Sequence, residues 1–192
     1  MFKRSLLALA LASASAAAFA APVTFVLDPD HTNVVASWNH LGFSNPVAHF
    51  GEVDGTLVYD DADVGASSVT VTLPLTGMDG HVDAFNEHLR SADLFDADQY
   101  PQITFRSTRV EATGPDRLKV TGDLTIKGIT REVVLDTRLN GRGEHPMAKR
   151  EAIGFDATTT VKRSEFGLGY ALPAVGDTVQ LRITTEALVP AE

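Results

Sequence analysis

Histidines and carboxylates concentrate in residues 81–105, HVDAFNEHLRSADLFDADQYPQITF. Imidazole and carboxylate groups are common metal ligands, and paired carboxylates can carry out general acid–base chemistry. His81 and His88 are seven residues apart, so on one helix they would lie roughly 10 Å apart at a rise of 1.5 Å per residue. One ion cannot bridge that separation without a third element, and the sequence has no HExxH pair. The spacing therefore does not favour a metal site.

The other residues of this stretch that could act in chemistry favour structural roles. Asp93, Asp96 and Asp98 cluster beside Tyr100. In an acidic chain such a cluster is typical of helix caps and solvated turns. The chain has neither a GxSxG nor a GxxxxGK[ST] motif, and it has no cysteine, which excludes thiol catalysis and Cys-based zinc sites. We expect no catalytic site and no metal site.

Two groups of basic residues could contact an anionic ligand. Arg142, His145, Lys149 and Arg150 fall in a predicted hairpin loop, where solvated side chains are the usual outcome. Arg163 belongs to KRSEFG (162–167), where a strand is expected to end. An arginine at the mouth of a barrel can bind a phosphate bidentately, or it can pair with an acidic loop.

Most of the chain alternates apolar and polar residues with period two, which predicts strands with one face in an apolar interior. The alternation recurs around residues 69–75, 103–105, 118–126, 133–139, 153–161 and 179–183. Turn signals separate these segments, for example at 113–117 (TGPDR) and 139–146 (LNGRGEHP). Many antiparallel strands of this kind indicate an all-β sandwich or a closed barrel.

The segments before residue 67 are less regular. Residues 47–60 (VAHFGEVDGTLVYD) predict a strand in which the apolar residues change from one face to the other near Gly51. We expect a β-bulge there, because bulges shift parity and bend barrel strands.

One helical insert is expected at about residues 82–97. Val82, Phe85 and Leu89 recur at helical spacing, and Tyr100-Pro101 follows as a stop signal. The chain should then enter a strand at Gln102. An amphipathic helix between two strands is well placed to cap one end of a barrel.

The first twenty residues have the features of a secretory signal peptide. Lys3 and Arg4 precede an apolar run, and small residues at Ala18 and Ala20 suit cleavage between Ala20 and Ala21. Residues 21–192 would then form one domain, located in a bacterial periplasm or outside the cell. No later segment approaches the roughly 20 apolar residues of a spanning helix, so stable membrane insertion is not expected.

The charge of the chain is strongly negative. The formal net charge is −9, and removal of Lys3 and Arg4 with the leader takes it to −11. Nucleic acids and anionic lipid surfaces call for a basic footprint, so we expect no nucleic-acid partner.

Six blocks of sequence, taken together, resemble the YceI-like (polyisoprenoid-binding) family of secreted bacterial proteins. The blocks are LDPDHTNV (27–34), WNHLGFS (38–44), HFGEVDG (49–55), EHLRSADLFDADQYPQITFRST (87–108), GDLTIKGIT (122–130) and KRSEFGL (162–168). Their order is preserved from about Leu27 to Leu188. The resemblance departs at Ala48, where a glycine is common, and at Trp38, where a smaller or Phe-like residue is usual and where the indole could shorten a cavity.

The resemblance implies a single antiparallel, roughly eight-stranded lipocalin-like barrel whose apolar cavity holds an isoprenoid or another long-chain amphiphile. His40 and Arg163 are then candidates for contact with a polar head group. The residues that the resemblance places at the cavity or its mouth are Trp38, His40, Phe43, Phe50, Phe85, Leu89, Phe95, Phe105, Arg163 and Phe166.

The expected function is therefore a periplasmic, non-catalytic carrier of a long-chain lipid, with no cofactor other than that ligand. Two alternatives stay open. One is an enzyme or accessory factor acting on a lipid or quinone, and the other is a protein-interaction module serving a membrane redox partner. Homodimerisation is possible, because twofold symmetry is common among soluble proteins.

Overall fold

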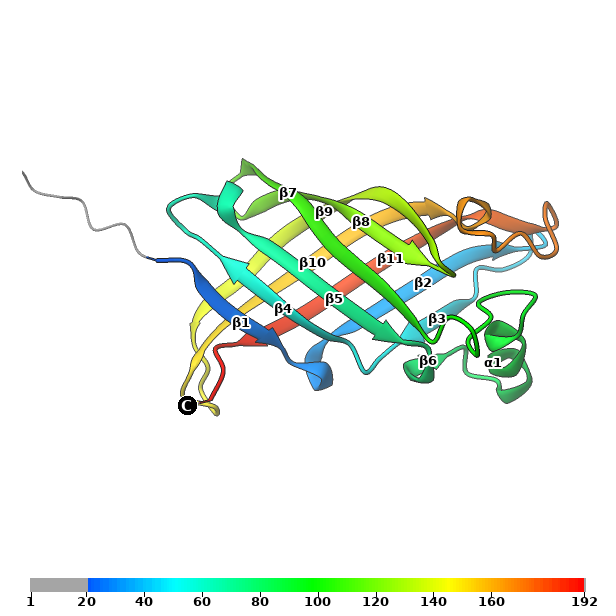
Figure 1. Cartoon of the computed structure of the whole chain (residues 1–192), viewed down its shortest axis with the longest axis horizontal. Coiled ribbons are helices and arrows are strands. Elements are labelled where there is room, and N and C mark those ends of the chain that lie inside the picture. The colour runs from blue at the N-terminus through cyan, green and yellow to red at the C-terminus, as the bar shows by residue number, and fades with distance from the viewer. Residues whose placement is uncertain (1–20, 192) are drawn as a thin grey trace, which may run out of the picture.

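The computed structural model describes residues 21–191 and shows one antiparallel sheet that closes on itself (Figure 1). Five uninterrupted strands follow one another around the wall, each paired with the next. These strands are β7 (Gln102–Gly114), β8 (Arg117–Ile126), β9 (Ile129–Glu144), β10 (Glu151–Lys162) and β11 (Val175–Leu188).

Each of the other three positions in the wall is filled by two short strands. β1 (Val23–Leu27) and β2 (Asn33–His40) both pair with β11. β4 (Asp54–Tyr59) pairs with β1, and β3 (Val47–Phe50) pairs with β2. β5 (Ser68–Pro74) lies between β4 and β7, and β6 (Met78–Asp79) pairs with β3. The result is a closed eight-stranded antiparallel barrel, which confirms the predicted fold.

Two of the interruptions meet in space at a pair of glycines. The Gly51 N–H donates to the Gly77 carbonyl at 2.9 Å, and a Cβ on Gly77 would lie only 2.5 Å from the Gly51 oxygen. Glu52 adopts a φ of 54° between β3 and β4. The predicted single strand over 47–60 with a bulge at Gly51 is therefore wrong, because the chain breaks there to make this close contact.

The two predicted turns have different outcomes. The turn at 113–117 is confirmed, since β7 ends at Gly114 and β8 begins at Arg117. The turn at 139–146 is wrong, because β9 continues to Glu144 and the reversal follows at residues 145–150. Gly141 pairs with Gly154 and Leu139 pairs with Phe155, so Asn140 is the extra residue of a bulge. Glycine and asparagine at this site thus serve a bulge within a strand.

The helical insert is confirmed as α1 (Asp83–Arg90), followed by turns up to Tyr100. The Arg90 guanidinium fixes it to the barrel by donating to the carbonyls of Leu75 (3.1 Å), Thr76 (3.4 Å) and Met78 (2.6 Å). α1 lies at the same end of the barrel as residues 41–46 and 163–174 (Figure 1). We call this the helix end, and we call the opposite end, with the β9–β10 turn, the hairpin end.

Three further short segments are 3-10 turns. They are η1 (Pro29–His31), η2 (Val64–Ala66) and η3 (Leu75–Gly77), which lie before α1. One more 3-10 turn, η4 (Arg163–Phe166), follows β10. No helix of residues 21–191 is both long and apolar enough to cross a membrane.

Candidate ligand-binding cavity

The barrel encloses a cavity with a volume of about 880 Å³. Ligand pockets in proteins generally measure about 300–1,000 Å³, so this cavity is large enough for a sizeable ligand. Its wall is formed by the inward side chains of the strands, among them Val34, Leu57, Val71, Val120, Leu135 and Ile183. Because every second residue of a strand points inward, the period-two pattern of the sequence supplies an almost wholly apolar lining.

Aromatic side chains from separate segments line the helix end of the cavity. Trp38 of β2 lies beside Phe85 of α1 with ring centroids 5.9 Å apart. Phe50 of β3 meets Phe95, which follows α1, at 6.1 Å in an edge-on arrangement. These two contacts join the helical insert to the β2–β3 pair, so the insert forms part of the cavity wall.

The cavity opens at the helix end. Large apolar side chains that both line it and are exposed to solvent lie only there among the described residues: Leu41, Val82 and Tyr170. His88 of α1 packs edge-on against Tyr170, with ring centroids 4.8 Å apart, and both residues line the cavity. The mouth is therefore bounded by α1 on one side and by the 163–174 loop on the other.

Tyr59 lines the cavity toward the hairpin end. Its ring packs against Phe155 at 6.0 Å, and the Arg142 guanidinium lies over the rings of Tyr59 and Phe25 at 5.5 and 5.8 Å. Burial raises the pKa of the Tyr59 phenol, so this hydroxyl is neutral at physiological pH.

Arg142 is held in place by two carboxylates. It donates to Glu151 at 2.7 Å and also pairs with Asp61. Burial by itself lowers the pKa of Arg142, but Glu151 and Asp61 outweigh it and raise the pKa above its ordinary value. The expectation of a solvated loop was wrong for Arg142, since it stands on β9 and covers aromatic rings.

Few polar groups line the inside of the barrel, and two of them, the hydroxyls of Thr32 and Thr185, are paired with each other. Thr32 is 2% exposed, and its hydroxyl bonds to that of Thr185 at 2.8 Å. Both residues line the cavity. Because the two hydroxyls bond to each other, neither needs a hydrogen bond from a ligand, and covering them with an apolar ligand costs little free energy.

Arg163 is the charged residue buried on the cavity wall, with 8% of its surface exposed. Its guanidinium donates to four carbonyls, those of Leu168, Tyr170 (2.9 Å), Val175 (2.8 Å) and Gly176 (2.9 Å). Burial lowers its pKa from the ordinary arginine value, although the nearby Asp177 opposes the shift. Because its donors are taken by the 168–176 backbone, Arg163 fastens that loop across the end of β10.

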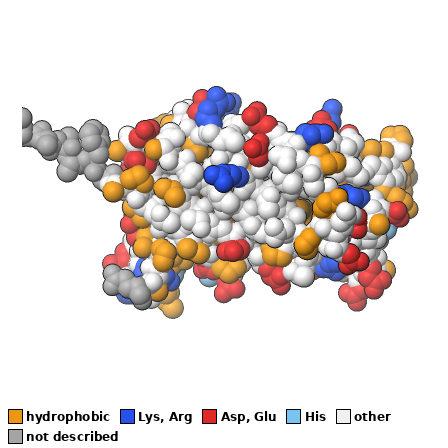
Figure 2. All heavy atoms as spheres, in the orientation of Figure 1, with side chains coloured by type: hydrophobic (Ala, Val, Ile, Leu, Met, Phe, Trp, Pro, Cys, Tyr) orange, Lys and Arg blue, Asp and Glu red, His pale blue; other side chains and the backbone are white. Residues whose placement is uncertain are grey.

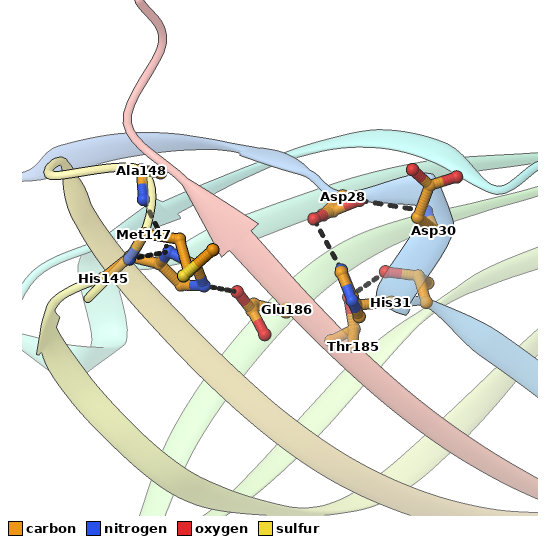
Figure 3. A network of polar contacts seen from close by, with 9 residues as sticks. Asp28, Asp30, His31, His145, Met147, Ala148, Thr185 and Glu186 are labelled. Atoms are coloured by element: carbon orange, nitrogen blue, oxygen red, sulfur yellow. Dashed lines mark hydrogen bonds and ion pairs between the residues drawn. The ribbon is translucent and has the colours of Figure 1, made fainter.

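A polar network on the outside of the barrel supports the wall where β1 gives way to β2 (Figure 3). Asp28 caps η1 by accepting from the Asp30 N–H at 2.9 Å and pairs with His31 at 2.8 Å. The bond from His31 lowers the pKa of Asp28, and the same bond raises the pKa of His31. The Asp28 N–H also donates to the Glu186 carbonyl at 2.8 Å, which ties this turn to β11.

His145 extends this network from the β9–β10 turn (Figure 3). Its Nδ1 accepts from the N–H groups of Met147 (3.3 Å) and Ala148 (2.9 Å). Nε2 is then the ring nitrogen that carries the proton, and it faces Glu186 of β11 at 3.1 Å. Glu186 Oε1 is buried and accepts no hydrogen bond within residues 21–191, so its contact with the His145 ring is close but lacks hydrogen-bond geometry.

Nine of the ten site residues expected from the sequence lie on the cavity wall. They are Trp38, His40, Phe50, Phe85, Leu89, Phe95, Phe105, Arg163 and Phe166. Their contact with a ligand stays a prediction. For Arg163 a head-group role is disfavoured, because the backbone carbonyls already use its donors.

Phe43 is the exception. It is 92% exposed in the 41–46 loop and does not line the cavity. The expected place of Phe43 at the cavity or its mouth is therefore corrected: Phe43 lies at the helix end beside the mouth, but its side chain is exposed and outside the cavity lining. Its neighbours His40 and Leu41 do reach the mouth.

Sequence reasoning did not name Leu41, His88 or Tyr170 as site residues, and all three lie at the mouth. Leu41 and Tyr170 come from loops without periodicity. The signal that could have marked these loops is the absence of charge: residues 33–51 and 166–176 contain no Asp, Glu, Lys or Arg.

No group of three His, Cys, Asp or Glu residues between positions 21 and 191 could hold a metal ion. Among the hydrogen bonds of that same region, neither His40 nor His88 pairs its ring with an aspartate. His81 instead lies beside Asp79 at 3.5 Å, on the surface.

A closed antiparallel barrel around one deep apolar cavity defines the class: a barrel of the kind that holds a small apolar ligand. The model of the YceI-like domain matches residues 25–187. The chain is also 36% identical over 189 residues to Protein YceI of Shigella flexneri, covering 97% of this chain and 98% of that one. The chain therefore belongs to the YceI-like family.

Solved structures agree with this fold. BcnA of Burkholderia cenocepacia superposes with a TM-score of 0.76 at 26% identity, covering 83% of this chain and 98% of that one. A polyisoprenoid-binding domain from Saccharophagus degradans superposes with a TM-score of 0.64, covering 86% and 98% of the two chains. Identity to that domain is 14%, so the likeness concerns the fold alone.

Proposed function

We propose that this protein is a non-catalytic carrier that holds a polyisoprenoid or a similar long-chain amphiphile in its barrel. The observation that carries the proposal is the cavity of about 880 Å³ with an apolar wall and a mouth at the helix end. A long apolar chain suits such a wall because it needs no hydrogen-bond partners inside the cavity.

The shape of the barrel favours an extended ligand. β10 has 12 residues, so the strand spans roughly 40 Å at about 3.4 Å per residue, which leaves roughly 30 Å along the axis for a strand tilted by about 40°. Burial of apolar area contributes about 25 cal/mol per Å², less the cost of ordering the ligand. A chain tens of ångströms long would therefore bind well even if its head group remained in water.

A structural neighbour supports the same ligand class. The Saccharophagus degradans neighbour is described as a polyisoprenoid-binding domain, and it shares the barrel architecture. A shared fold does not fix a ligand, so the support comes from the likeness and the apolar cavity together.

The periplasm is the proposed location. The support is the composition of residues 1–20, which lie outside the described residues, and the expected cleavage between Ala20 and Ala21. The acidic net charge of −9 supports a partner that is not a nucleic acid.

The test begins with protein expressed from the full sequence and purified from a periplasmic fraction. Intact-mass measurement reports the N-terminus, and solvent extraction followed by mass spectrometry should return a long-chain lipid. Stripped protein should then take up an isoprenoid quinone offered from solvent. Repeated extraction that yields no lipid, together with no uptake, would contradict the proposal.

The enzyme alternative is distinguished in the same experiment. A carrier returns the offered quinone with its mass unchanged after prolonged incubation. A new product that forms only with the protein present would favour an enzyme acting on the lipid.

A further inference from the structure

Exposed apolar side chains gather at the mouth of the cavity. Eight large apolar residues are exposed in the described part of the chain, and five of them lie at the helix end: Leu41, Phe43, Val82, Tyr170 and Leu172. Figure 2 shows a group of hydrophobic side chains at the end of the molecule where Figure 1 places the 163–174 loop, and others lie elsewhere on the same face. Single exposed apolar residues are ordinary, but such a concentration at one end marks an interaction surface.

Two loops form this surface, and they are tied together. The Leu41 N–H donates to the Ala174 carbonyl at 3.1 Å, and Val175 of β11 pairs with His40 of β2. Arg163 holds the second loop from below through its four carbonyl contacts. The exposed side chains are therefore presented on a braced support.

The two loops are also uncharged in a strongly acidic molecule. Residues 33–51 and 166–176 contain no Asp, Glu, Lys or Arg, although the net charge of the chain is −9. We name residues 41–46 and 167–174 the apolar rim. An uncharged surface loses little when a partner removes its water. The headgroup–acyl boundary of a bilayer is such a partner, because it takes up apolar side chains.

We infer that the apolar rim docks reversibly on a lipid bilayer, with Phe43, Tyr170 and Leu172 inserted at the interface, so that the cavity opens toward the membrane. The inference deepens the proposed function and rests on it for its purpose, since a water-insoluble ligand must leave one membrane and reach another. Leu41 and Tyr170 belong both to the rim and to the cavity mouth, so the docked surface is continuous with the ligand's path.

The charges beside the rim specify which bilayer suits it. Residues 79–98, which include α1, carry six Asp or Glu residues and one Arg. These carboxylates would face an anionic surface unfavourably, and the field that they create is screened by salt. The rim should therefore prefer zwitterionic vesicles, and added salt should improve its weak binding to anionic ones.

The test is co-flotation of the purified protein with phosphatidylcholine–phosphatidylethanolamine vesicles, compared with vesicles that contain phosphatidylglycerol. Phe43→Ser and Leu172→Ser should each lower the partition coefficient by roughly threefold to tenfold, the loss expected for one partly inserted apolar side chain. Met147→Ser is the matched control, because Met147 is 85% exposed at the hairpin end. It should leave the partition unchanged.

Three results would overturn the inference. The first is no flotation with any vesicle. The second is binding to phosphatidylglycerol vesicles alone, and the third is equal losses in Met147→Ser and Phe43→Ser. If sedimentation shows that Phe43→Ser dissociates a dimer while vesicles are never bound, then the rim covers a second copy of the chain instead.

Failure of the rim and failure of the carrier function can be told apart. Phe43→Ser and Leu172→Ser should take up quinone from solvent as the parent does, while transfer from vesicles slows. If the parent protein floats with vesicles but never takes up quinone, the membrane-docking inference stands and the carrier proposal is contradicted. If the parent protein takes up quinone from solvent but does not float, the carrier proposal stands and the membrane-docking inference is contradicted.

Discussion

Arg163 shows how a single residue can suggest one role in the sequence and adopt another in the fold. An arginine at the end of a strand near a barrel mouth is a reasonable ligand for an anionic head group. In the structure the guanidinium is buried, and it donates to four backbone carbonyls of the loop that follows. Removal of the guanidinium would take a charged donor from all four carbonyls at once, and hydrogen bonds to charged groups contribute about 1.5–3 kcal/mol.

We predict that Arg163→Met lowers the free energy of unfolding by about 3 kcal/mol, the scale expected when buried carbonyls lose a charged donor. Arg163→Lys should recover little of this loss, because one ammonium cannot match the planar fork of donors. Urea unfolding followed by circular dichroism measures both changes.

The control for this experiment is Arg106→Lys, since Arg106 is exposed on β7 and should shift stability by less than about 0.5 kcal/mol. A different result would restore the head-group role of Arg163. That result is an Arg163→Lys protein of parental stability that takes up anionic amphiphiles more weakly.

At the scale of elements, α1 depends on the barrel for its existence. It has eight residues, and isolated helices of that length are marginal in water. Its stability must come from Phe85 and Leu89 packing into the cavity wall and from the bonds of Arg90 to the η3–β6 backbone. The helix is thus both a cap on the barrel and a part of the cavity.

We predict that Phe85→Asp lowers quinone affinity at least tenfold. A carboxylate at the mouth would face the apolar chain of the ligand and lose the contact with Trp38, whose ring centroid lies 5.9 Å away. Quenching of Trp38 fluorescence on titration with the quinone reports the affinity, since Trp38 is the single tryptophan of the chain and lines the cavity.

His81→Gln is the control for the helix, because His81 is exposed just before α1 and does not line the cavity. His88 is unsuitable for that purpose, since it borders the mouth beside Tyr170. Parental affinity in Phe85→Asp would show that α1 is not part of the binding wall.

For the molecule as a whole, the essential feature is that the barrel is hollow in some places and packed in others. Ala157 of β10 and Ala187 of β11 are both buried alanines on neighbouring strands. Ala157 lines the cavity, whereas Ala187 is 0% exposed and lies in the packed core. A larger side chain introduced at each of these two positions therefore tests whether the interior there is empty or closely packed.

We predict that Ala157→Phe keeps the free energy of unfolding within about 1.5 kcal/mol of the parent, because the new ring has room. The ring should shorten the space left for a ligand, so extracted lipids should shift to shorter chains in mass spectrometry. Ala187→Phe should instead destabilise the protein by about 1–3 kcal/mol or more through overpacking.

Both stabilities are measured by urea unfolding. If Ala157→Phe is as destabilising as Ala187→Phe and retains the parental ligand, the interior at Ala157 is not the space that the ligand occupies.

The sequence by itself determined the long strands from residue 67 onward, the helical insert and most of the wall. Period-two alternation fixes which side chains face inward, because a strand turns successive residues to opposite faces, and Val120, Phe155 and Leu181 follow that rule. Helical spacing of Phe85 and Leu89 likewise located α1. These signals are local, and local geometry suffices to interpret them.

Tertiary structure alone decided how those faces combine. The pairing of β1 with β11 closes the barrel, and Arg142 meets Asp61 across 81 positions of sequence. Phe43 was misplaced because the direction of a loop depends on what it packs against, and here the 41–46 loop packs beside residue 174. An inward apolar face is the same in a filled core and in a tunnel, so the cavity follows from the circumference of the closed barrel and from the sizes of side chains that meet across it.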